Sequence, residues 1–175
     1  MKPAVFFDRD GTLMEEVEYC GDPAKVRVYP GVPQALRRLK DAGFLAFIIT
    51  NQSGIARGLF TEAQYHQVQA ELMRQIGDGL IDASYFCADL PGVPSARRKP
   101  EPGMVLEAAG AYDIDLPRSW FIGDKGIDVE CGQRAGTRTI LVRTGYGKDQ
   151  RCEPDYVAAD VVEAVRDVLD GIEES

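Results

Sequence analysis

Short apolar runs alternate with longer amphipathic segments along the chain, and this alternation limits the fold more than any other feature. Short apolar runs are typical of buried strands, and amphipathic segments of helices that pack one face on a core. The run "FLAFIIT" has no alternating polar residue, as expected for a parallel strand covered on both faces. The expected strands are residues 5–8, 44–50, 81–87, 119–124 and 138–142, and the expected helices are residues 32–42, 61–76, 127–135, 160–170 and a segment from residue 102.

The regular order of strand and helix predicts an α/β fold. Because each strand is followed by a crossover segment, the strands are expected to lie parallel, with helices on both faces of the sheet. This is a three-layer, Rossmann-like architecture. A length of 175 residues favours a single domain over residues 1–175, and an apolar content of 45% is enough for a core of that size.

The charge balance limits the partners of the chain. A net charge of −8 argues against a general binder of nucleic acid or of an anionic membrane surface, because clustered Lys and Arg hold such partners. The apolar start is interrupted at Asp8, and no stretch approaches the roughly 20 apolar residues of a membrane helix. We therefore expect a soluble, monomeric protein of the cytoplasm. A small phosphorylated ligand remains possible, since it needs only a few local cations.

Polar side chains follow three of the expected strands at the points where those strands end. The carboxyl ends of parallel strands meet at one edge of a sheet, and ligands bind there. Lys99 comes just ahead of the helix expected from residue 102, and so belongs to the same edge. The first strand ends in Asp8, with Asp10 just past it. The second ends in Thr50, followed by Asn51, Gln52 and Ser53, and the fourth ends in Asp124, followed by Lys125 and Asp128.

Asp8, Asp10 and Asp124 together predict an oxygen-rich pocket. Converging carboxylates are costly unless a cation neutralises them. Oxygen ligands suit Mg²⁺, which often binds through one or two carboxylates and a substrate phosphate. Thr50 and Lys99 offer a hydroxyl and an ammonium group to the remaining phosphate oxygens.

Zinc is not expected in this chain. The four cysteines are widely spaced, no CxxC pair occurs, and His66 is the only histidine. The spacing therefore gives no support to a site with Cys and His ligands. The thiols are expected to be free, as in a reducing compartment.

Four short motifs resemble those of the haloacid dehalogenase superfamily, in the order of that family and over residues 5–142. They are "DRDGT", "IITN", "RRKPEPG" and "GDKGID". The resemblance implies a Mg²⁺-dependent phosphatase in which Asp8 attacks phosphorus and forms an aspartyl-phosphate. Asp10 would protonate the leaving oxygen and then activate water. The implied metal ligands are Asp8, the Asp10 backbone carbonyl and Asp124, with Asp128 in support, and the implied phosphate-binding residues are Thr50, Asn51 and Lys99.

The spaces around these motifs hold only loops, which resembles the branch of the superfamily that has no cap domain. The segment "TNQSGIARGLFTEAQY" is similar to the histidinol-phosphatase and heptose-bisphosphatase group. That likeness implies a small phosphomonoester as substrate. A heptose bisphosphate cleaved at its 7-phosphate is favoured, and histidinol phosphate or another small sugar phosphate is the alternative. The implied substrate-binding residues are Gln52, Ser53, Arg98, Lys125, Glu16 and Tyr19.

One loop departs from the pattern of that group. Many members carry a zinc-binding Cys-x-His pair and a later Cys-x-Cys pair ahead of the third motif. The corresponding segment "CADLPGVPSARRK" keeps only Cys87. We therefore expect a shortened loop without a metal, which leaves the exact substrate open.

A receiver-like signalling domain is the alternative of a different class. Receiver domains are short, doubly wound and phosphorylated on an aspartate with Mg²⁺. They carry the acceptor after the third strand, where only Asp89 stands, and a lysine after the fifth, where Arg143 stands instead. A long-lived aspartyl-phosphate would favour this alternative, and rapid turnover of a sugar phosphate would favour the enzyme.

Overall fold

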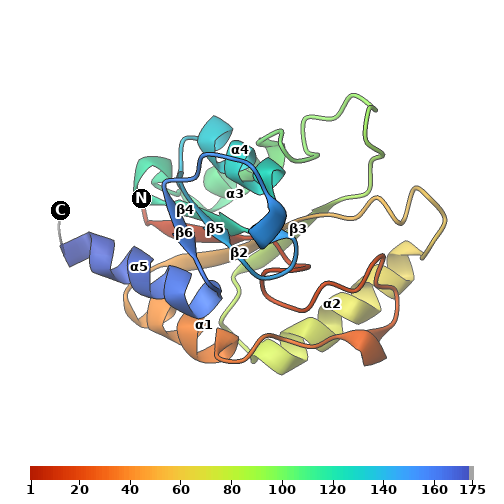
Figure 1. The fold of residues 1–175 in the computed structure, drawn as a ribbon, viewed down its shortest axis with the longest axis horizontal. Helices are drawn as coiled ribbons and strands as arrows, with labels where there is room; N and C mark the ends of the chain where they lie inside the picture. Colours follow the sequence, from red (N-terminus) through yellow and green to blue (C-terminus); the bar gives the residue numbers. More distant parts are fainter. Residues whose placement is uncertain (174–175) are drawn as a thin grey trace.

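The computed structural model describes residues 1–173 and contains one sheet of six parallel strands. The strand order is β3-β2-β1-β4-β5-β6, so that β1 and β4 are neighbours in the middle of the sheet (Figure 1). The predicted parallel, Rossmann-like α/β sheet is confirmed. The strands are β1 Ala4–Phe7, β2 Leu45–Asn51, β3 Ala83–Cys87, β4 Trp120–Gly123, β5 Arg138–Val142 and β6 Tyr156–Ala158.

Five α-helices cover the two faces of the sheet and complete three layers. Helices α1, α2 and α5 pack on one face, and α3 and α4 pack on the other (Figure 1). Helix α2 begins with the predicted capping box, in which the side chains of Thr61 and Gln64 each accept the other's backbone N–H. The helices are α1 Val32–Asp41, α2 Glu62–Ile76, α3 Gly103–Tyr112, α4 Gly126–Ala135 and α5 Val161–Glu173.

Successive residues of β1 point to opposite faces, and both faces are buried. Val5 packs in the core beneath α1, α2 and α5, whereas Phe6 packs in the core beneath α3 and α4. The Phe6 ring stacks on Phe47 and Phe121, with centroids 5.4 and 6.4 Å apart. Because all four residues of β1 are fully buried, this strand has no polar position until the chain leaves the sheet at Asp8.

The edge strand β6 was not predicted from the sequence. It is three residues long, and only Ala158 of the three is buried, so its apolar pattern is too short to identify. The last helix also differs slightly from the prediction. It begins at Val161, because Asp160 lies before the helix and its Oδ1 accepts the backbone N–H of Glu163 at 2.9 Å.

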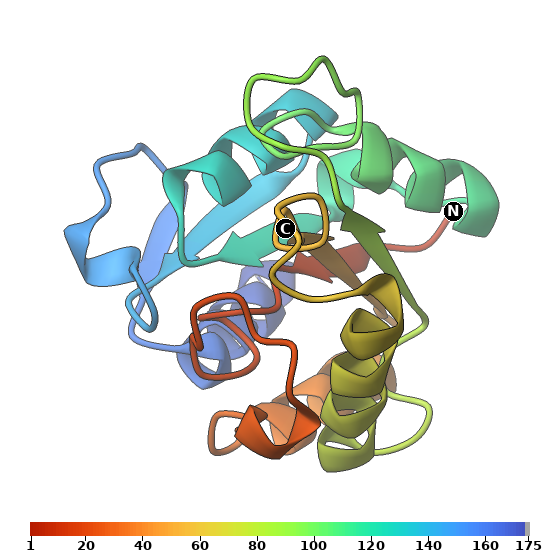
Figure 2. The same cartoon turned by 90° about the vertical axis from the view of Figure 1, so that its right-hand side faces the viewer.

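Two long connections lie at the carboxyl edge of the sheet. Residues 8–31 contain one short 3₁₀-helix, Pro23–Lys25, and residues 88–102 contain neither helix nor strand. Neither connection contains a cap domain, in agreement with the predicted capless architecture. Figure 2 looks onto this edge, with the loops after β1, β2 and β3 around its centre. Among residues 1–173, no helix is both long enough and apolar enough to cross a membrane.

Candidate active site

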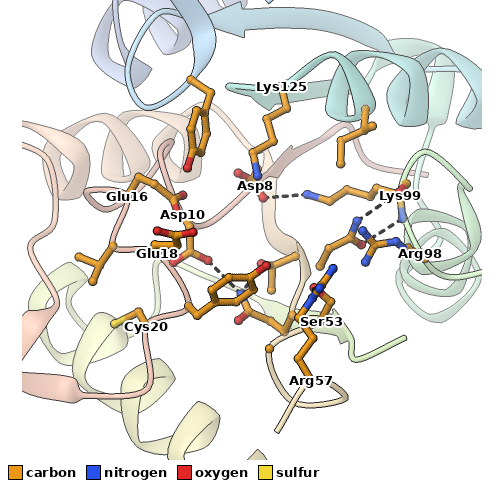
Figure 3. A pocket seen from close by; sticks show the side chains of 18 residues that line it. Asp8, Asp10, Glu16, Glu18, Cys20, Ser53, Arg57, Arg98, Lys99 and Lys125 are labelled. Atoms are coloured by element: carbon orange, nitrogen blue, oxygen red, sulfur yellow. Dashed lines mark hydrogen bonds and ion pairs between the residues drawn. The ribbon is translucent and has the colours of Figure 1, made fainter. Parts of the chain in front are cut away.

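A cavity of about 270 Å³ lies at the carboxyl edge of the sheet. Its side chains come from the end of β2, from the loops that follow β1, β2, β4 and β5, from the start of α4 and from the loop that leads to α3 (Figure 3). Two predicted residues, Asp124 and Asp128, do not line the cavity and are completely buried. The predicted residues that line it are Asp8, Asp10, Glu16, Tyr19, Thr50, Asn51, Gln52, Ser53, Arg98, Lys99 and Lys125.

Lys99 joins two of the carboxylates at the bottom of this cavity. Its Nζ donates hydrogen bonds to Asp8 Oδ1 at 2.7 Å, to Asp128 Oδ1 at 2.7 Å and to the Ile49 carbonyl at 2.9 Å. Burial opposes the charge of Lys99, but Asp128 and Asp8 outweigh it and hold its pKa above the ordinary value. Burial also opposes ionisation of Asp8, yet the Lys99 ammonium holds the pKa of Asp8 below its ordinary value. Asp8 is therefore an ionised carboxylate that faces the cavity and can act as a nucleophile.

Asp124 completes a cluster of three buried carboxylates. One oxygen of each of Asp8, Asp124 and Asp128 lies within 4.8 Å of the others. Burial raises the pKa of Asp124 to about 9, and the charges of Asp8 and Asp128 add to this effect. Burial and Asp8 also raise the pKa of Asp128 to about 6. Burial and mutual repulsion thus oppose ionisation of the whole cluster, and a divalent cation bound among its oxygens would favour the ionised carboxylates.

Two glycines let the backbone close against the Asp124 carboxylate. Gly11 and Gly145 have positive φ angles of 86° and 54°, and a Cβ atom on either would overlap Asp124. The Tyr146 backbone N–H donates to Asp124 Oδ2 at 3.0 Å, and Thr144 Oγ1 donates to the Gly11 carbonyl at 2.6 Å. The loop after β5 is therefore attached to the loop after β1 directly beside the carboxylate cluster.

Asp10 is held in place by a separate set of side chains. Arg9 Nε and Nη2 donate to its two carboxylate oxygens at 3.0 and 3.2 Å. Gln52 Nε2 donates to Asp10 Oδ2 at 2.9 Å and to Thr50 Oγ1 at 2.8 Å. The Arg9 side chain is fully buried, and its guanidinium lies 5.3 Å from the centroid of the Tyr65 ring. These contacts hold the Asp10 carboxylate in a defined position at the cavity wall.

Asn51 pairs with the backbone of Lys99. Its Nδ2 donates to the Lys99 carbonyl at 3.1 Å, and its Oδ1 accepts the Lys99 N–H at 3.0 Å. This pair attaches the loop before α3 to the end of β2 and places the Lys99 side chain. The predicted contact of Asn51 with phosphate stays a prediction, as does that of Gln52 with substrate.

The wall of the cavity also carries charged side chains that form no hydrogen bond with the carboxylate cluster. Arg98 Nη1 donates to the Asp89 carbonyl at 3.0 Å, and Lys125 Nζ lies 5.1 Å from the centroid of the Tyr146 ring. Burial raises the pKa of Glu16 to about 7, and the Asp10 charge adds to this effect. Arg98, Lys125 and Glu16 all line the cavity, and the Lys125 side chain extends toward Asp8 (Figure 3).

Several residues of the site were missed by reasoning from the sequence. Thr12 Oγ1 lies 3.5 Å from Asp8 Oδ2 and 3.4 Å from Asp124 Oδ1, and it stands in the "DRDGT" motif that pointed to the site. Arg57 lines the cavity and stands in the segment that carried the finer resemblance. Tyr146 had no signal in the sequence, because only the tertiary structure brings the loop after β5 to Asp124.

The loop that begins at Cys87, which departs from the pattern of the group, is held by contacts among its own side chains. Cys87 Sγ lies 3.4 Å from Asp89 Oδ2 and 3.7 Å from Ser95 Oγ. Asp89 is exposed and lies outside the cavity. A receiver domain would need this residue at the centre of the site, so the geometry favours the phosphatase.

Comparison with known proteins identifies the family. The HAD-hydrolase-like family matches residues 96–166. The chain is 40% identical to D-glycero-D-manno-heptose-1,7-bisphosphate 7-phosphatase of Thermosynechococcus vestitus, over 94% of each chain. It is 39% identical to D-glycero-beta-D-manno-heptose-1,7-bisphosphate 7-phosphatase of Escherichia coli, over 82% of this chain and 80% of that one. The crystal structure of D,D-heptose 1,7-bisphosphate phosphatase from B. bronchiseptica, complexed with magnesium and phosphate, has a TM-score of 0.89 and 31% identity, with 97% of this chain and 99% of that chain covered. The chain therefore belongs to the HAD-like phosphomonoester hydrolases, in the family of the heptose-1,7-bisphosphate 7-phosphatases.

Proposed function

We propose that this phosphatase hydrolyses the 7-phosphate of a D-glycero-D-manno-heptose 1,7-bisphosphate, with Mg²⁺ as cofactor. The observation that carries the proposal is the ionised Asp8, bound to Lys99, in a cavity that the cations Arg98 and Lys125 also line. The names of the similar proteins support the same substrate. The single sheet of residues 1–173 and a cavity lined by residues of one chain also support a single-domain, monomeric enzyme.

The residues present fit a magnesium ion. The cluster of Asp8, Asp124 and Asp128 offers only oxygen ligands. The raised pKa of Asp124 reflects burial next to two other carboxylates, a position in which a cation would favour its ionised form. We propose Asp8, Asp124 and the Asp10 backbone carbonyl as ligands. Asp128 accepts a hydrogen bond from Lys99, and we propose that it helps to hold the cluster without binding the ion itself. A bound Mg²⁺ would neutralise negative charge on the transferring phosphoryl group.

The proposed reaction has two displacements at phosphorus. In the first, an Asp8 oxygen forms a bond to phosphorus while the bond from phosphorus to the sugar oxygen breaks. Asp10 gives its proton to that leaving oxygen. In the second, Asp10 takes a proton from water, the water oxygen attacks phosphorus, and the bond to Asp8 breaks to release inorganic phosphate. Lys99 and the Thr50 hydroxyl are proposed to hold the other phosphoryl oxygens through both steps.

The charges on the cavity wall favour a bisphosphate over histidinol phosphate. Neither Arg98 nor Lys125 forms a salt bridge to a carboxylate among the described side chains of residues 1–171, and we propose that Arg98 binds the second phosphate. Histidinol phosphate carries an amine in place of that phosphate, and these two cations would repel it. We propose that Ser53, Tyr19 and Glu16, which line the same cavity, contact the sugar between the two phosphates.

The experiment that tests this function is phosphate release from a panel of substrates with Mg²⁺. The panel contains the heptose 1,7-bisphosphate, several sugar monophosphates and histidinol phosphate. We expect the bisphosphate to have the highest kcat/KM, and we expect Asp8→Asn to abolish turnover while substrate binding survives. A higher kcat/KM for histidinol phosphate, or undiminished activity of Asp8→Asn, would refute the substrate or the nucleophile respectively.

A further inference from the structure

We propose that Arg57 is a specificity-determining residue that binds the distal phosphate of the substrate together with Arg98. The distal phosphate is the one that is not cleaved. This inference rests on the proposed function, because it requires a substrate with two phosphates. Nothing in the chemistry at Asp8 and Lys99 needs Arg57, so its role can be tested separately.

Arg57 is held at the cavity by residues of two different loops. Its Nε donates a hydrogen bond to Ser53 Oγ at 3.3 Å within the loop after β2. Its guanidinium carbon lies 5.8 Å from the centroid of the Tyr19 ring, which comes from the loop after β1. Arg57, Ser53 and Tyr19 all line the cavity that contains Asp8, and Figure 3 shows Arg57 and Ser53 there. The guanidinium is thus oriented by a hydrogen bond on one nitrogen and an aromatic face beside it.

The two terminal nitrogens of Arg57 remain available for a ligand. Within residues 1–173, no hydrogen bond or salt bridge involves its Nη1 or Nη2. Arg97 stands in clear contrast, because its guanidinium is bound to Glu107 at 2.7 Å and to the Phe86 carbonyl at 2.9 Å. Arg97 is occupied within the protein, whereas Arg57 presents its free edge at the cavity.

The backbone of Tyr19 gives a second reason to assign a function to this wall. Tyr19 has a φ angle of 51°, in the left-handed region that a bulky residue seldom adopts. Its side chain is still 43% exposed, so core packing does not account for the conformation. A strained backbone that holds an aromatic ring against a cation at a cavity is typical of a ligand-binding element.

The chemistry of the wall fits a phosphate dianion. Arg57 and Arg98 enter the same cavity from two different loops, and no carboxylate of the described chain forms a salt bridge with either. A guanidinium binds two phosphate oxygens at once, and two guanidinium groups can share the three oxygens of one phosphate. Lys99 and Thr50 serve the phosphate that is cleaved, and Arg57 with Arg98 serves the one that remains.

The test compares two sugars that differ only in the distal phosphate, namely the heptose 1,7-bisphosphate and the heptose 7-phosphate. Arg57→Ala is expected to lower kcat/KM for the bisphosphate about 10- to 100-fold, mainly through KM, because it removes charge-assisted hydrogen bonds. The same variant is expected to change kcat/KM for the 7-phosphate less than about 2-fold. Arg57→Lys is expected to recover part of the loss, and Arg98→Ala to show the same selectivity.

Arg97→Ala is the matched control, since this neighbouring arginine is already paired within the protein. It should leave the preference for the bisphosphate unchanged. Equal losses of Arg57→Ala on both sugars, or no loss on either, would overturn the assignment of Arg57 while the phosphatase function stands. Absence of wild-type turnover of the bisphosphate would instead contradict the proposed function, and the role of Arg57 would fall with it.

Discussion

Replacement of Lys99 by methionine tests how the carboxylate cluster is stabilised. Methionine has a similar length and volume but no charge, so the variant removes the ammonium and leaves little space. The Asp8 and Asp128 carboxylates would then face each other in the protein interior without the cation that now bridges them. We therefore expect Lys99→Met to lower the free energy of unfolding in addition to removing activity.

The size of the effect follows from the two ion pairs. At 2.7 Å and an effective dielectric constant of roughly 20, each pair corresponds to about 6 kcal/mol of Coulomb attraction. Desolvation of the three buried groups offsets most of this attraction. Removal of one partner from a buried ion pair costs about 3–5 kcal/mol, and we expect a loss of that size for Lys99→Met at pH 7.

Urea unfolding followed by circular dichroism measures this loss directly. In EDTA the full destabilisation is expected, and in saturating Mg²⁺ a smaller one, because the bound cation neutralises part of the cluster. The double variant Lys99→Met/Asp128→Asn should recover at least about 1 kcal/mol, since one of the unpaired carboxylates is also gone. A Lys99→Met variant that unfolds within about 0.5 kcal/mol of wild type in EDTA would refute the reasoning.

Further predictions concern the cavity wall and the loop beside Asp124. Burial and the Asp10 charge raise the pKa of Glu16 from 4.5 to about 7, so the folded protein favours the neutral form of this side chain. The contribution of Glu16 to the stability of the fold is therefore present in acid and is lost as the pH rises through about 7. Its charge then opposes an anionic substrate, and we expect KM for the bisphosphate to rise between pH 7 and about 8.5 in wild type but to stay flat in Glu16→Gln. Gly145→Ala places a Cβ against Asp124 and Gly11, and should weaken Mg²⁺ activation and cost more stability than Gly79→Ala. Gly79 has a similarly positive φ and open space around it, so its variant should cost only about 1 kcal/mol of backbone strain. Equal effects of the two glycine variants in thermal unfolding and Mg²⁺ titration would show that Asp124 does not need this close approach. A KM that rises with pH in Glu16→Gln as it does in wild type would exclude the role of Glu16.

The sequence predicted those strands well whose own residues are almost all apolar and buried. β1, β2 and β5 were found because their residues are almost all buried, and a run such as 44–50 has no polar alternation. β6 was missed because Tyr156 and Val157 are exposed, and the segment is a strand only through its pairing with β5. The residues of β6 alone do not predict that pairing.

The predicted site residues divide in the same way. Asp8 directly follows β1, Thr50 stands near the carboxyl end of β2, and Lys99 comes shortly before α3, so the parallel topology alone places them at one edge. The Arg9 pair with Asp10 and the Tyr146 bond to Asp124 depend on how side chains and loops pack, which spacing along the chain does not show. Burial of the Asp124 carboxylate beneath the cavity could not be predicted from its position after β4.

The most direct test of the central claim is ³¹P NMR of the heptose 1,7-bisphosphate during turnover by the wild-type enzyme with Mg²⁺. The two phosphates have separate signals, so the spectrum shows which ester bond breaks. We expect the 7-phosphate signal to disappear as inorganic phosphate grows, while the 1-phosphate signal remains, and we expect no change with Asp8→Asn or in excess EDTA. Loss of the 1-phosphate signal, or phosphate release that continues in the Asp8→Asn variant, would contradict the proposed function.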